Sequence, residues 1–228
     1  HARALDDALK AITVCDPAIG SGAFPVGMMT EIVRARSALT PYFNNVAERT
    51  SYHFKRHAIQ NSLYGVDIDV GAVEIAKLRL WLSLVVDEED VQQIKPLPNL
   101  DYKVVVGNSL LGVEKNLFNE EQFKQLEALK PKFFDESDRT KKAQFKQQIE
   151  ALIHDLTRGR KVFDFEIYFS EVFHAKGGFD VVIGNPPYVR QEEIKTLKPL
   201  LKHYECGAGT ADLFVYFYER GVKLLRKG

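Results

Sequence analysis

The chain of 228 residues has few cysteines, no excess of either charge and no long apolar run, and each absence excludes a class of protein. Cys15 and Cys206 lie far apart in different contexts, which argues against a disulfide framework and favours a reducing cytosol. Lys plus Arg and Asp plus Glu each total 31, so the chain is not a strongly basic nucleic-acid-binding module. No apolar run reaches the roughly 18 residues of a membrane span, and the N-terminus lacks the apolar stretch of a signal peptide.

The composition that remains is that of an ordinary globular domain, with 45% hydrophobic and 27% charged residues. Four short apolar segments are typical of buried strands, and each is followed by a turn: 11–15, 62–66, 102–106 and 179–183. Helical patterns alternate with them, at 2–10, about 25–39, 71–86 and from Asp212 to about 226. This alternation predicts an α/β fold with a mostly parallel sheet. The helix at 71–86 is so apolar that we expect it to be buried on most sides.

Residues 114–161 differ from the rest of the chain because they are rich in Lys, Glu and Gln. Apolar residues at helical spacing predict two helices here, with a break near Pro131. We expect this segment to be a helical insertion within the domain, with its charges on a solvated face.

A glycine-rich turn follows the first predicted strand, from Asp16 to Phe24. Gly20 and Gly22 let the backbone approach a ligand, because no side chain stands in the way. The fingerprint of nicotinamide-dependent enzymes fits poorly, since the third glycine, Gly27, comes two positions late and the next strand-end acid lies about 50 residues away instead of about 20. The turn therefore disfavours a nicotinamide cofactor, although structural tightness alone would also explain its glycines.

Two further strand ends carry polar side chains that suit an adenosine. Asp67 ends the second strand, where a carboxylate can accept hydrogen bonds from both hydroxyls of a ribose. The alternative is that Asp67 or Asp69 merely caps the next helix. Asn108 follows the third strand, and its amide can pair with the amino group and a ring nitrogen of adenine. Gly107-Asn108 is also an ordinary turn pair.

The fourth turn, Asn185-Pro186-Pro187-Tyr188, is the most specific feature. Its prolines fix the backbone and lack amide donors, which leaves carbonyls free to accept hydrogen bonds. The Asn185 side-chain oxygen and the Pro186 carbonyl can accept both hydrogens of an exocyclic amine, which keeps the nitrogen lone pair available for attack. Tyr188 offers a flat face to a base, a contact worth roughly 1–3 kcal/mol in other systems. Alone the prolines would indicate a rigid loop, but their place after a strand of a nucleotide-binding sheet favours catalysis.

These motifs resemble those of a known class of enzyme. Residues 16–24 resemble the cofactor motif of DNA methyltransferases that methylate amino groups, and residues 185–188 resemble their catalytic motif. The order of the two motifs matches the gamma arrangement of adenine-N6 methyltransferases. The surrounding segments 64–69, 76–82, 107–110 and 163–169 are similar to type IIG-like restriction–modification and phage-defence methylases. The resemblance implies a Rossmann-like fold that uses S-adenosylmethionine, in one partial catalytic domain over residues 1–228.

The resemblance also implies roles for individual residues. The first turn is expected to bind the cofactor, mostly around its methionine part, through Asp16, Ala18, Gly20, Gly22 and Phe24. The next two turns are expected to hold the ribose with Asp67, to cover the cofactor adenine with Ile68 and to reach its amino edge with Asn108. The catalytic motif is expected to hold a target adenine flipped out of the duplex, through Asn185, Pro186, Pro187 and Tyr188.

The sequence ends at Lys227-Gly228, where the resemblance places the start of a fifth strand. The later strands, the target-recognition domain and any nuclease are not in this sequence. We therefore expect a catalytic core cut from a larger polypeptide, with double-stranded DNA bound through a recognition domain elsewhere. The resemblance further implies a cytoplasmic location in a bacterium or archaeon and no membrane partner.

Other interpretations remain open from the sequence. Protein-glutamine and some RNA methyltransferases also use Asn-Pro-Pro-Tyr, but their cofactor motif usually reads Asp-x-Gly-x-Gly-x-Gly, from which residues 16–18 depart. A non-catalytic module of a defence complex is another alternative. His53 and His57 have the spacing of a helical zinc pair, but Phe54 stands where the protease motif needs Glu. Basic residues after the catalytic turn suit either DNA phosphates or a solvated face: Arg190, Lys195, Lys198 and Lys202.

Overall fold

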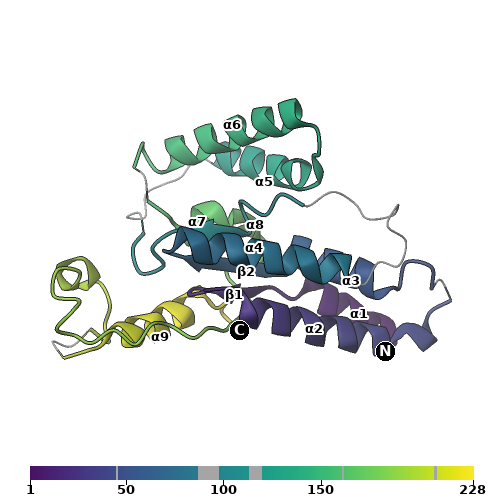
Figure 1. Cartoon of the computed structure of the whole chain (residues 1–228), viewed down its shortest axis with the longest axis horizontal. Coiled ribbons are helices and arrows are strands. Elements are labelled where there is room, and N and C mark those ends of the chain that lie inside the picture. The colour runs from purple at the N-terminus through teal and green to yellow at the C-terminus, as the bar shows by residue number, and fades with distance from the viewer. Residues whose placement is uncertain (45, 87–97, 113–119, 161, 208–209) are drawn as a thin grey trace.

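The structure of the chain, a computed structural model, describes residues 1–44, 46–86, 98–112, 120–160, 162–207 and 210–228. Four parallel strands form one sheet in the order β3-β2-β1-β4 (Figure 1): β1 Val14–Asp16, β2 Leu63–Asp67, β3 Val104–Val106 and β4 Val181–Val182. Val14 pairs with Leu63 on one side and with Val181 on the other, and Gly65 pairs with Val104. The predicted Rossmann-like α/β fold with a parallel sheet is confirmed.

Successive residues of the strands enter different cores because side chains alternate between the two faces of a sheet. Leu63 and Val104 pack with helices of one face, whereas Tyr64 and Val105 pack with a cluster of phenylalanines on the other. Burial on both faces is the reason that the strands appear in the sequence as short, continuous apolar runs.

Four helices belong to the first face of the sheet: α1 Ala2–Ala11, α2 Ala23–Ala38, α3 Ser51–Asn61 and α4 Val70–Val85. The short 3-10 helix η1, Thr40–Tyr42, follows α2. Thr50 and Asp69 cap α3 and α4 by accepting hydrogen bonds from the amides of His53 and Ala72. These caps fix where both helices begin.

The other face is covered in two layers (Figure 1). The short helices α7, Phe165–Tyr168, and α8, Ser170–Lys176, pack directly on the sheet. Helices α5, Glu120–Asp135, and α6, Arg139–Leu156, pack on each other and on α7 and α8. The 3-10 helix η3, Lys198–Leu201, precedes α9, Leu213–Leu224, which contacts β4. Leu225 then forms one parallel bridge with Phe179.

The break between the two helices predicted at 114–161 lies further along the chain than predicted. Pro131 lies inside α5, and the break comes at 136–138, where Asp138 caps α6 by accepting hydrogen bonds from two backbone amides. Proline removes one amide donor from a helix. The last turn of α5 nevertheless persists because Phe133 is buried in the core between α5 and α6 and Phe134 in the core of the first face.

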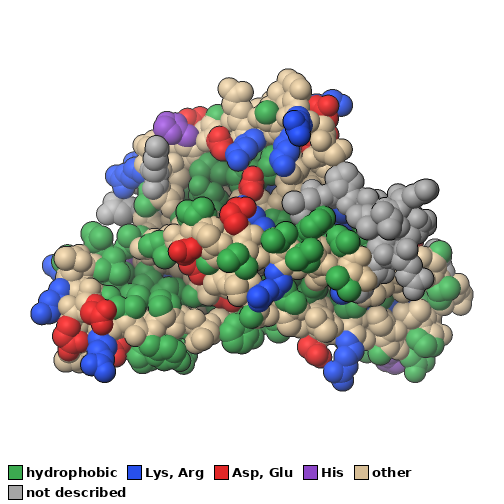
Figure 2. Space-filling model, viewed as in Figure 1, with side chains coloured by type: hydrophobic (Ala, Val, Ile, Leu, Met, Phe, Trp, Pro, Cys, Tyr) green, Lys and Arg blue, Asp and Glu red, His purple; other side chains and the backbone are tan. Residues whose placement is uncertain are grey.

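Helix α4 is less buried than its composition predicted. Val73, Ala76, Leu80 and Leu84 face the core, whereas Ile75, Leu78 and Leu82 are exposed. Figure 2 shows hydrophobic side chains on the surface over this helix. A helix that is apolar all round gives no sequence signal for the side that faces the sheet, so the prediction of burial on most sides was wrong.

The last helix begins where it was predicted, but for a different reason. Asp212 occupies the N-cap position of α9 and makes no side-chain cap. Its carboxylate accepts a hydrogen bond of 2.8 Å from the amide of Gln191 instead. Asp212 therefore holds the loop after the turn at 185–188 against the start of α9.

The structure adds two observations on the chain as a whole. Both cysteines are unpaired, with Cys15 buried and Cys206 half-buried. Within the described ranges, none of the helices has the length and hydrophobicity needed to cross a bilayer.

A buried carboxylate joins the first three segments of the chain. Asp6 on α1 is fully buried and accepts hydrogen bonds from Arg36 Nε at 3.0 Å and from Arg49 Nη1 at 3.1 Å. Lys10 completes the group with an Nζ–Oδ2 distance of 3.2 Å. Burial acts to raise the pKa of Asp6, but the three cations hold it well below its usual value of 3.8. The ionised carboxylate thus ties α1 to α2 and to the segment before α3.

We expect Asp6→Asn to lower the free energy of unfolding at pH 7 by about 3–5 kcal/mol, because it leaves buried guanidinium groups without their counter-charge. Urea unfolding measures the effect, and Asp7→Asn, at an exposed position of the same helix turn, should change it by under about 0.5 kcal/mol. Since the pKa of Asp6 is lowered, its contribution is present above pH 3.8 and is lost as the pH falls below that value. Equal effects of the two substitutions would contradict this account.

Candidate cofactor and catalytic site

The first turn, residues 17–22, connects β1 to α2 in a conformation that requires glycine. Gly20 and Gly22 have φ angles of +52° and +81°, in the left-handed region that side chains disfavour. A Cβ atom on Gly22 would lie 3.1 Å from the Cα and Cβ atoms of Ala76. At Gly20 the space in front of the backbone is open. The first glycine thus leaves room for a ligand, and the second lets α2 approach α4.

Asp67 at the end of β2 fastens this turn to the second one. Its Oδ2 accepts a hydrogen bond of 2.8 Å from the amide of Gly20, and its Oδ1 accepts one of 3.0 Å from the amide of Asp69. Helix α4 is capped by Asp69, whose Oδ1 accepts a 2.7 Å bond from the amide of Ala72. The two acids therefore have different tasks, and the helix-capping alternative applies to Asp69.

The third turn is joined to both of the others. The amide of Gly107 donates to the Asp67 carbonyl at 2.8 Å. The Ser109 hydroxyl, which is buried, donates to the Pro17 carbonyl at 2.6 Å. Asn108 lies between them, and its side-chain oxygen accepts a 3.0 Å bond from the Leu110 amide within the turn. The Asn108 side chain is thereby held at the edge shared with Asp67.

The fourth turn begins beside the first. A Cβ atom on Gly184 would lie 2.7 Å from Oδ1 of Asp16, so only glycine fits there. Asn185 follows and is exposed, as is Tyr188, whose side chain is 77% exposed. The ring of Tyr188 lies 5.6 Å from the ring of Phe214 on α9, centroid to centroid. The motif therefore presents an amide and an aromatic face to solvent.

Two adjoining clefts lie at these carboxyl ends of the strands, where open α/β sheets bind ligands. The first has a volume of about 390 Å³ and receives residues from all four turns, among them Gly20, Asp67, Asn108 and Asn185. The second, of about 310 Å³, lies between the fourth turn and α9 and is lined by Tyr188 and Phe214. The clefts share part of their wall: Pro17, Ala18, Asn185 and Phe217.

The predicted site residues are distributed unevenly over these clefts. The first cleft is lined by Ala18, Gly20, Asp67, Ile68, Asn108, Asn185 and Pro187, and the second adds Pro186 and Tyr188. Three predicted residues line neither cleft. Asp16 is buried behind the first turn, Gly22 faces α4, and Phe24 points outward with partial exposure. The prediction that these three residues contact a cofactor therefore has no support from the lining of the clefts.

Several lining residues were not predicted. Leu197 and Leu213 line the first cleft, Phe214 and Tyr218 the second, and Phe217 both. Leu197 directly precedes η3, and the others belong to α9, which was predicted only as a helix. The sequence signal that could have found the residues of α9 is its excess of aromatic side chains, some of which, such as Tyr218, are exposed.

Asp16 has an unusual environment for a carboxylate. Its Oδ1 accepts a 3.0 Å bond from the amide of Ala18, and its buried Oδ2 has no partner among the described residues. Burial raises the pKa of Asp16 to about 7, against the lowering effect of the Ala18 amide and with a further rise from the charge of Asp67. Asp16 therefore holds a buried acceptor without a counter-charge behind the first turn.

We expect Asp16→Asn to stabilise the chain at pH 8 by about 1–3 kcal/mol, because it removes a buried charge without a counter-ion. The raised pKa means that the wild-type carboxyl contributes most stability below pH 3.8 and loses it as the pH rises through about 7. The advantage of the variant should therefore shrink towards pH 4. Thermal unfolding at both pH values measures this. A variant less stable than wild type at pH 8 would contradict the account.

The histidine pair shows no sign of a metal site. His53 Nδ1 lies 2.8 Å from the Thr50 hydroxyl at the start of α3. Across the described part of the chain, no group of three potential ligands among His, Cys, Asp and Glu is close enough to hold a metal ion.

Comparison with known proteins decides the family. The sequence profile of the Eco57I restriction-modification methylase family matches residues 61–228. The chain belongs to this family. The predicted resemblance to restriction–modification methylases is thereby confirmed.

Named relatives are consistent with this membership. The chain is 44% identical over 120 residues, half of its length, to a putative type II restriction enzyme and methyltransferase of Methanocaldococcus jannaschii. It is 25% identical over 93% of its length to the type II restriction enzyme and methyltransferase RM.Eco57I of Escherichia coli. It is 26% identical over 95% of its length to the adenine-specific methyltransferase PglX of Streptomyces coelicolor. These matches span only 10%, 18% and 15% of the respective relatives.

Proposed function

We propose that the chain is the catalytic core of a DNA methyltransferase that transfers a methyl group from S-adenosylmethionine to the N6 amino group of adenine. One observation carries the proposal: the cleft lined by Asp67 and Asn108 shares Asn185 with a second cleft, which is lined by the exposed ring of Tyr188. Membership in a methylase family and a relative named adenine-specific support it.

The groups around the first cleft fit the parts of this cofactor. S-adenosylmethionine, when bound, supplies a methyl group on a positively charged sulfur. Each oxygen of Asp67 accepts one backbone amide and keeps a lone pair for a ribose hydroxyl. Ile68, 70% exposed at the cleft, offers apolar cover for adenine, and Asn108 offers an amide to its edge.

The second cleft suits a flipped adenine. Asn185 and the Pro186 carbonyl accept the two hydrogens of its amine, which localises the lone pair on nitrogen, while Tyr188 stacks on the ring. Apart from tyrosines, no titratable side chain of the described residues lines this cleft. The amine is therefore activated by hydrogen-bond acceptors, and the proton that it loses passes to solvent. Extrusion of the base is needed because the target atom lies inside the duplex stack.

Two alternatives use the same surface differently. A methyltransferase for RNA or protein glutamine would also hold an amine or amide at Asn185, but the matched family favours DNA. A non-catalytic module of a defence complex would not need the alignment of Asn185 with the cofactor cleft. The first alternative predicts methylated RNA or protein instead of methylated DNA, and the second predicts no methylated product.

The test is transfer of a labelled methyl group to duplex DNA, RNA and protein side by side, with nucleoside analysis of the product. Because the matched relatives are much longer, the chain is assayed both alone and within the longest polypeptide that carries it. We expect N6-methyladenine in DNA, and a rate at least about 100-fold lower for Asn185→Ala, whose lost acceptor acts on the reacting group. Asn44→Ala, at an exposed asparagine outside both clefts, should keep the wild-type rate.

Transfer of the labelled methyl group to RNA or protein instead of DNA would support the first alternative. Methylation of DNA that is unchanged by Asn185→Ala, or a product other than N6-methyladenine, would contradict the assigned chemistry. A folded polypeptide that binds the cofactor but methylates none of the three substrates would support the non-catalytic alternative.

A further inference from the structure

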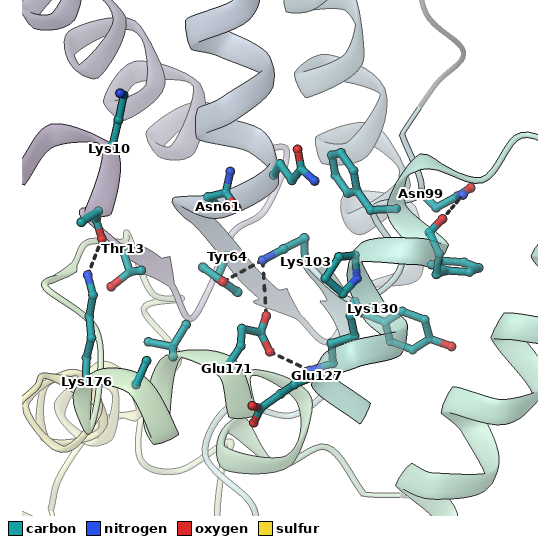
Figure 3. A pocket seen from close by; sticks show the side chains of 18 residues that line it. Lys10, Thr13, Asn61, Tyr64, Asn99, Lys103, Glu127, Lys130, Glu171 and Lys176 are labelled. Carbon is teal, nitrogen blue, oxygen red and sulfur yellow. Dashed lines mark hydrogen bonds and ion pairs between the residues drawn. The ribbon is translucent and has the colours of Figure 1, made fainter. Parts of the chain in front are cut away.

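A third cavity, of about 370 Å³, lies at the opposite end of the sheet from the two clefts. Its floor comes from residues that precede the strands: Thr13 before β1, Asn61 before β2 and Lys103 before β3. Helix α5 contributes Lys130 and Phe133, and α8 contributes Glu171 and Val172 (Figure 3). None of its lining residues lines either cleft at the carboxyl ends. The cavity is therefore a separate site.

Two buried ammonium groups in this cavity share one carboxylate (Figure 3). Lys103 Nζ lies 3.3 Å from Oε1 of Glu171, and Lys130 Nζ lies 2.8 Å from Oε2. The side chains of these lysines are only 14% and 7% exposed. Lys103 also donates to the Tyr64 hydroxyl at 2.7 Å, and Lys130 donates to the Tyr168 carbonyl. The group Lys103–Glu171–Lys130 thus carries one positive charge in excess.

The other charges at the cavity have their own partners. Lys10 pairs with Asp6 at 3.2 Å, and Lys176 pairs with Asp180 at 2.6 Å. Glu127 lies 2.7 Å from Nδ1 of His174, which is half-exposed. Four lysines and two glutamates line the cavity, so positive side chains outnumber negative ones there. A net charge inside a protein is costly and favours an ion of the opposite sign.

The protonation of the group agrees with this charge count. Burial lowers the pKa of Lys103 to about 8, opposed by Glu171 and assisted by the charge of Lys130. Burial acts to raise the pKa of Glu171, but Lys130 and Lys103 hold it at about 2. At neutral pH, Glu171 is ionised and each of its oxygens already contacts one lysine. A second anion would relieve the repulsion between the two lysines.

The remaining walls are apolar and aromatic. Pro131 of α5 is exposed at the cavity, Phe133, Phe134 and Val172 contribute only the edges of buried side chains, and Gln60 adds a side-chain amide at the end of α3. The volume falls within the range of ordinary small-molecule sites, which combine apolar walls with a few convergent polar groups. Such walls suit a small organic group, and the lysines suit a single anionic group attached to it.

We propose that this cavity binds a nucleoside monophosphate, with the phosphate beside Lys103 and Lys130 and the base against the apolar wall of α5. The proposal gives the insertion a function, because α5 supplies one of the two ammonium groups and most of the apolar wall. It does not depend on the function proposed for the carboxyl-end clefts.

Calorimetric titration of the chain with adenosine monophosphate tests the proposal, with adenosine as the uncharged control. We expect adenosine to bind at least tenfold more weakly than the monophosphate. Lys130→Met should raise the Kd of the monophosphate at least tenfold, because it removes the excess charge. Lys132→Met makes the same change at an exposed position of α5 outside the cavity and should leave the Kd within twofold of wild type.

Ala175→Trp keeps the test decisive if Lys130→Met fails to fold. Ala175 is exposed at the rim of the cavity, so tryptophan there fills the entrance without removing a buried contact. It should also raise the Kd at least tenfold while far-ultraviolet circular dichroism stays unchanged. Loss of binding in this variant, with wild-type affinity in Lys132→Met, would support the site on its own.

Three results would overturn the proposal. The first is no binding of the monophosphate at millimolar concentration by folded wild-type chain. The second is equal affinity for adenosine, which would remove the role of the lysines. The third is binding that is lost in Asp67→Ala and kept in Ala175→Trp, which would place the nucleotide in the carboxyl-end cleft.

Discussion

The site depends on one carboxylate that accepts two backbone amides. Asp67 receives hydrogen bonds from Gly20 in the first turn and from Asp69 in its own, and its carbonyl receives the amide of Gly107 in the third. A single residue at the end of β2 therefore sets the distance between three strand-end turns. The fourth turn joins them through the close contact of Gly184 with Asp16. The first cleft, with walls from all four turns, follows from these contacts.

The two ends of the sheet differ in the chemistry that they offer. At the carboxyl ends, Asp67 and the side-chain amides of Asn108 and Asn185 line the first cleft, and Asp16 behind it keeps a buried oxygen without a partner in the described part of the chain. At the amino ends, Lys103 and Lys130 carry an excess of positive charge beside aromatic walls. A cationic methyl donor suits the first end and an anion the second. The parallel arrangement of the strands makes this separation possible, because all strand ends of one kind meet at one edge.

The sequence was sufficient for the four strands, for the helices α1, α2, α4 and α9 and for the motifs, because these are encoded locally by apolar runs and glycine spacing. It did not predict α3, α7 or α8. It could not reveal contacts between distant residues, such as the bond from Gly20 to Asp67 or the shared carboxylate of Glu171. For the same reason it misjudged the break at Pro131, where tertiary packing of Phe133 and Phe134 outweighs the local effect of proline. The depth of Asp16 behind the cleft also depends on tertiary packing, through the missing side chain of Gly184.

We propose that Asp67 organises the turns and holds a ribose. The most direct test compares the Kd of S-adenosylhomocysteine with the Kd of its analogue without the two ribose hydroxyls. The account predicts that wild-type chain binds the analogue at least about tenfold more weakly, since two hydrogen bonds to a charged group are lost. In Asp67→Ala this discrimination should disappear, whereas in Asp69→Ala, where only a helix cap is lost, it should remain. Equal binding of the two ligands by folded wild-type chain, or discrimination that persists in Asp67→Ala, would contradict the account.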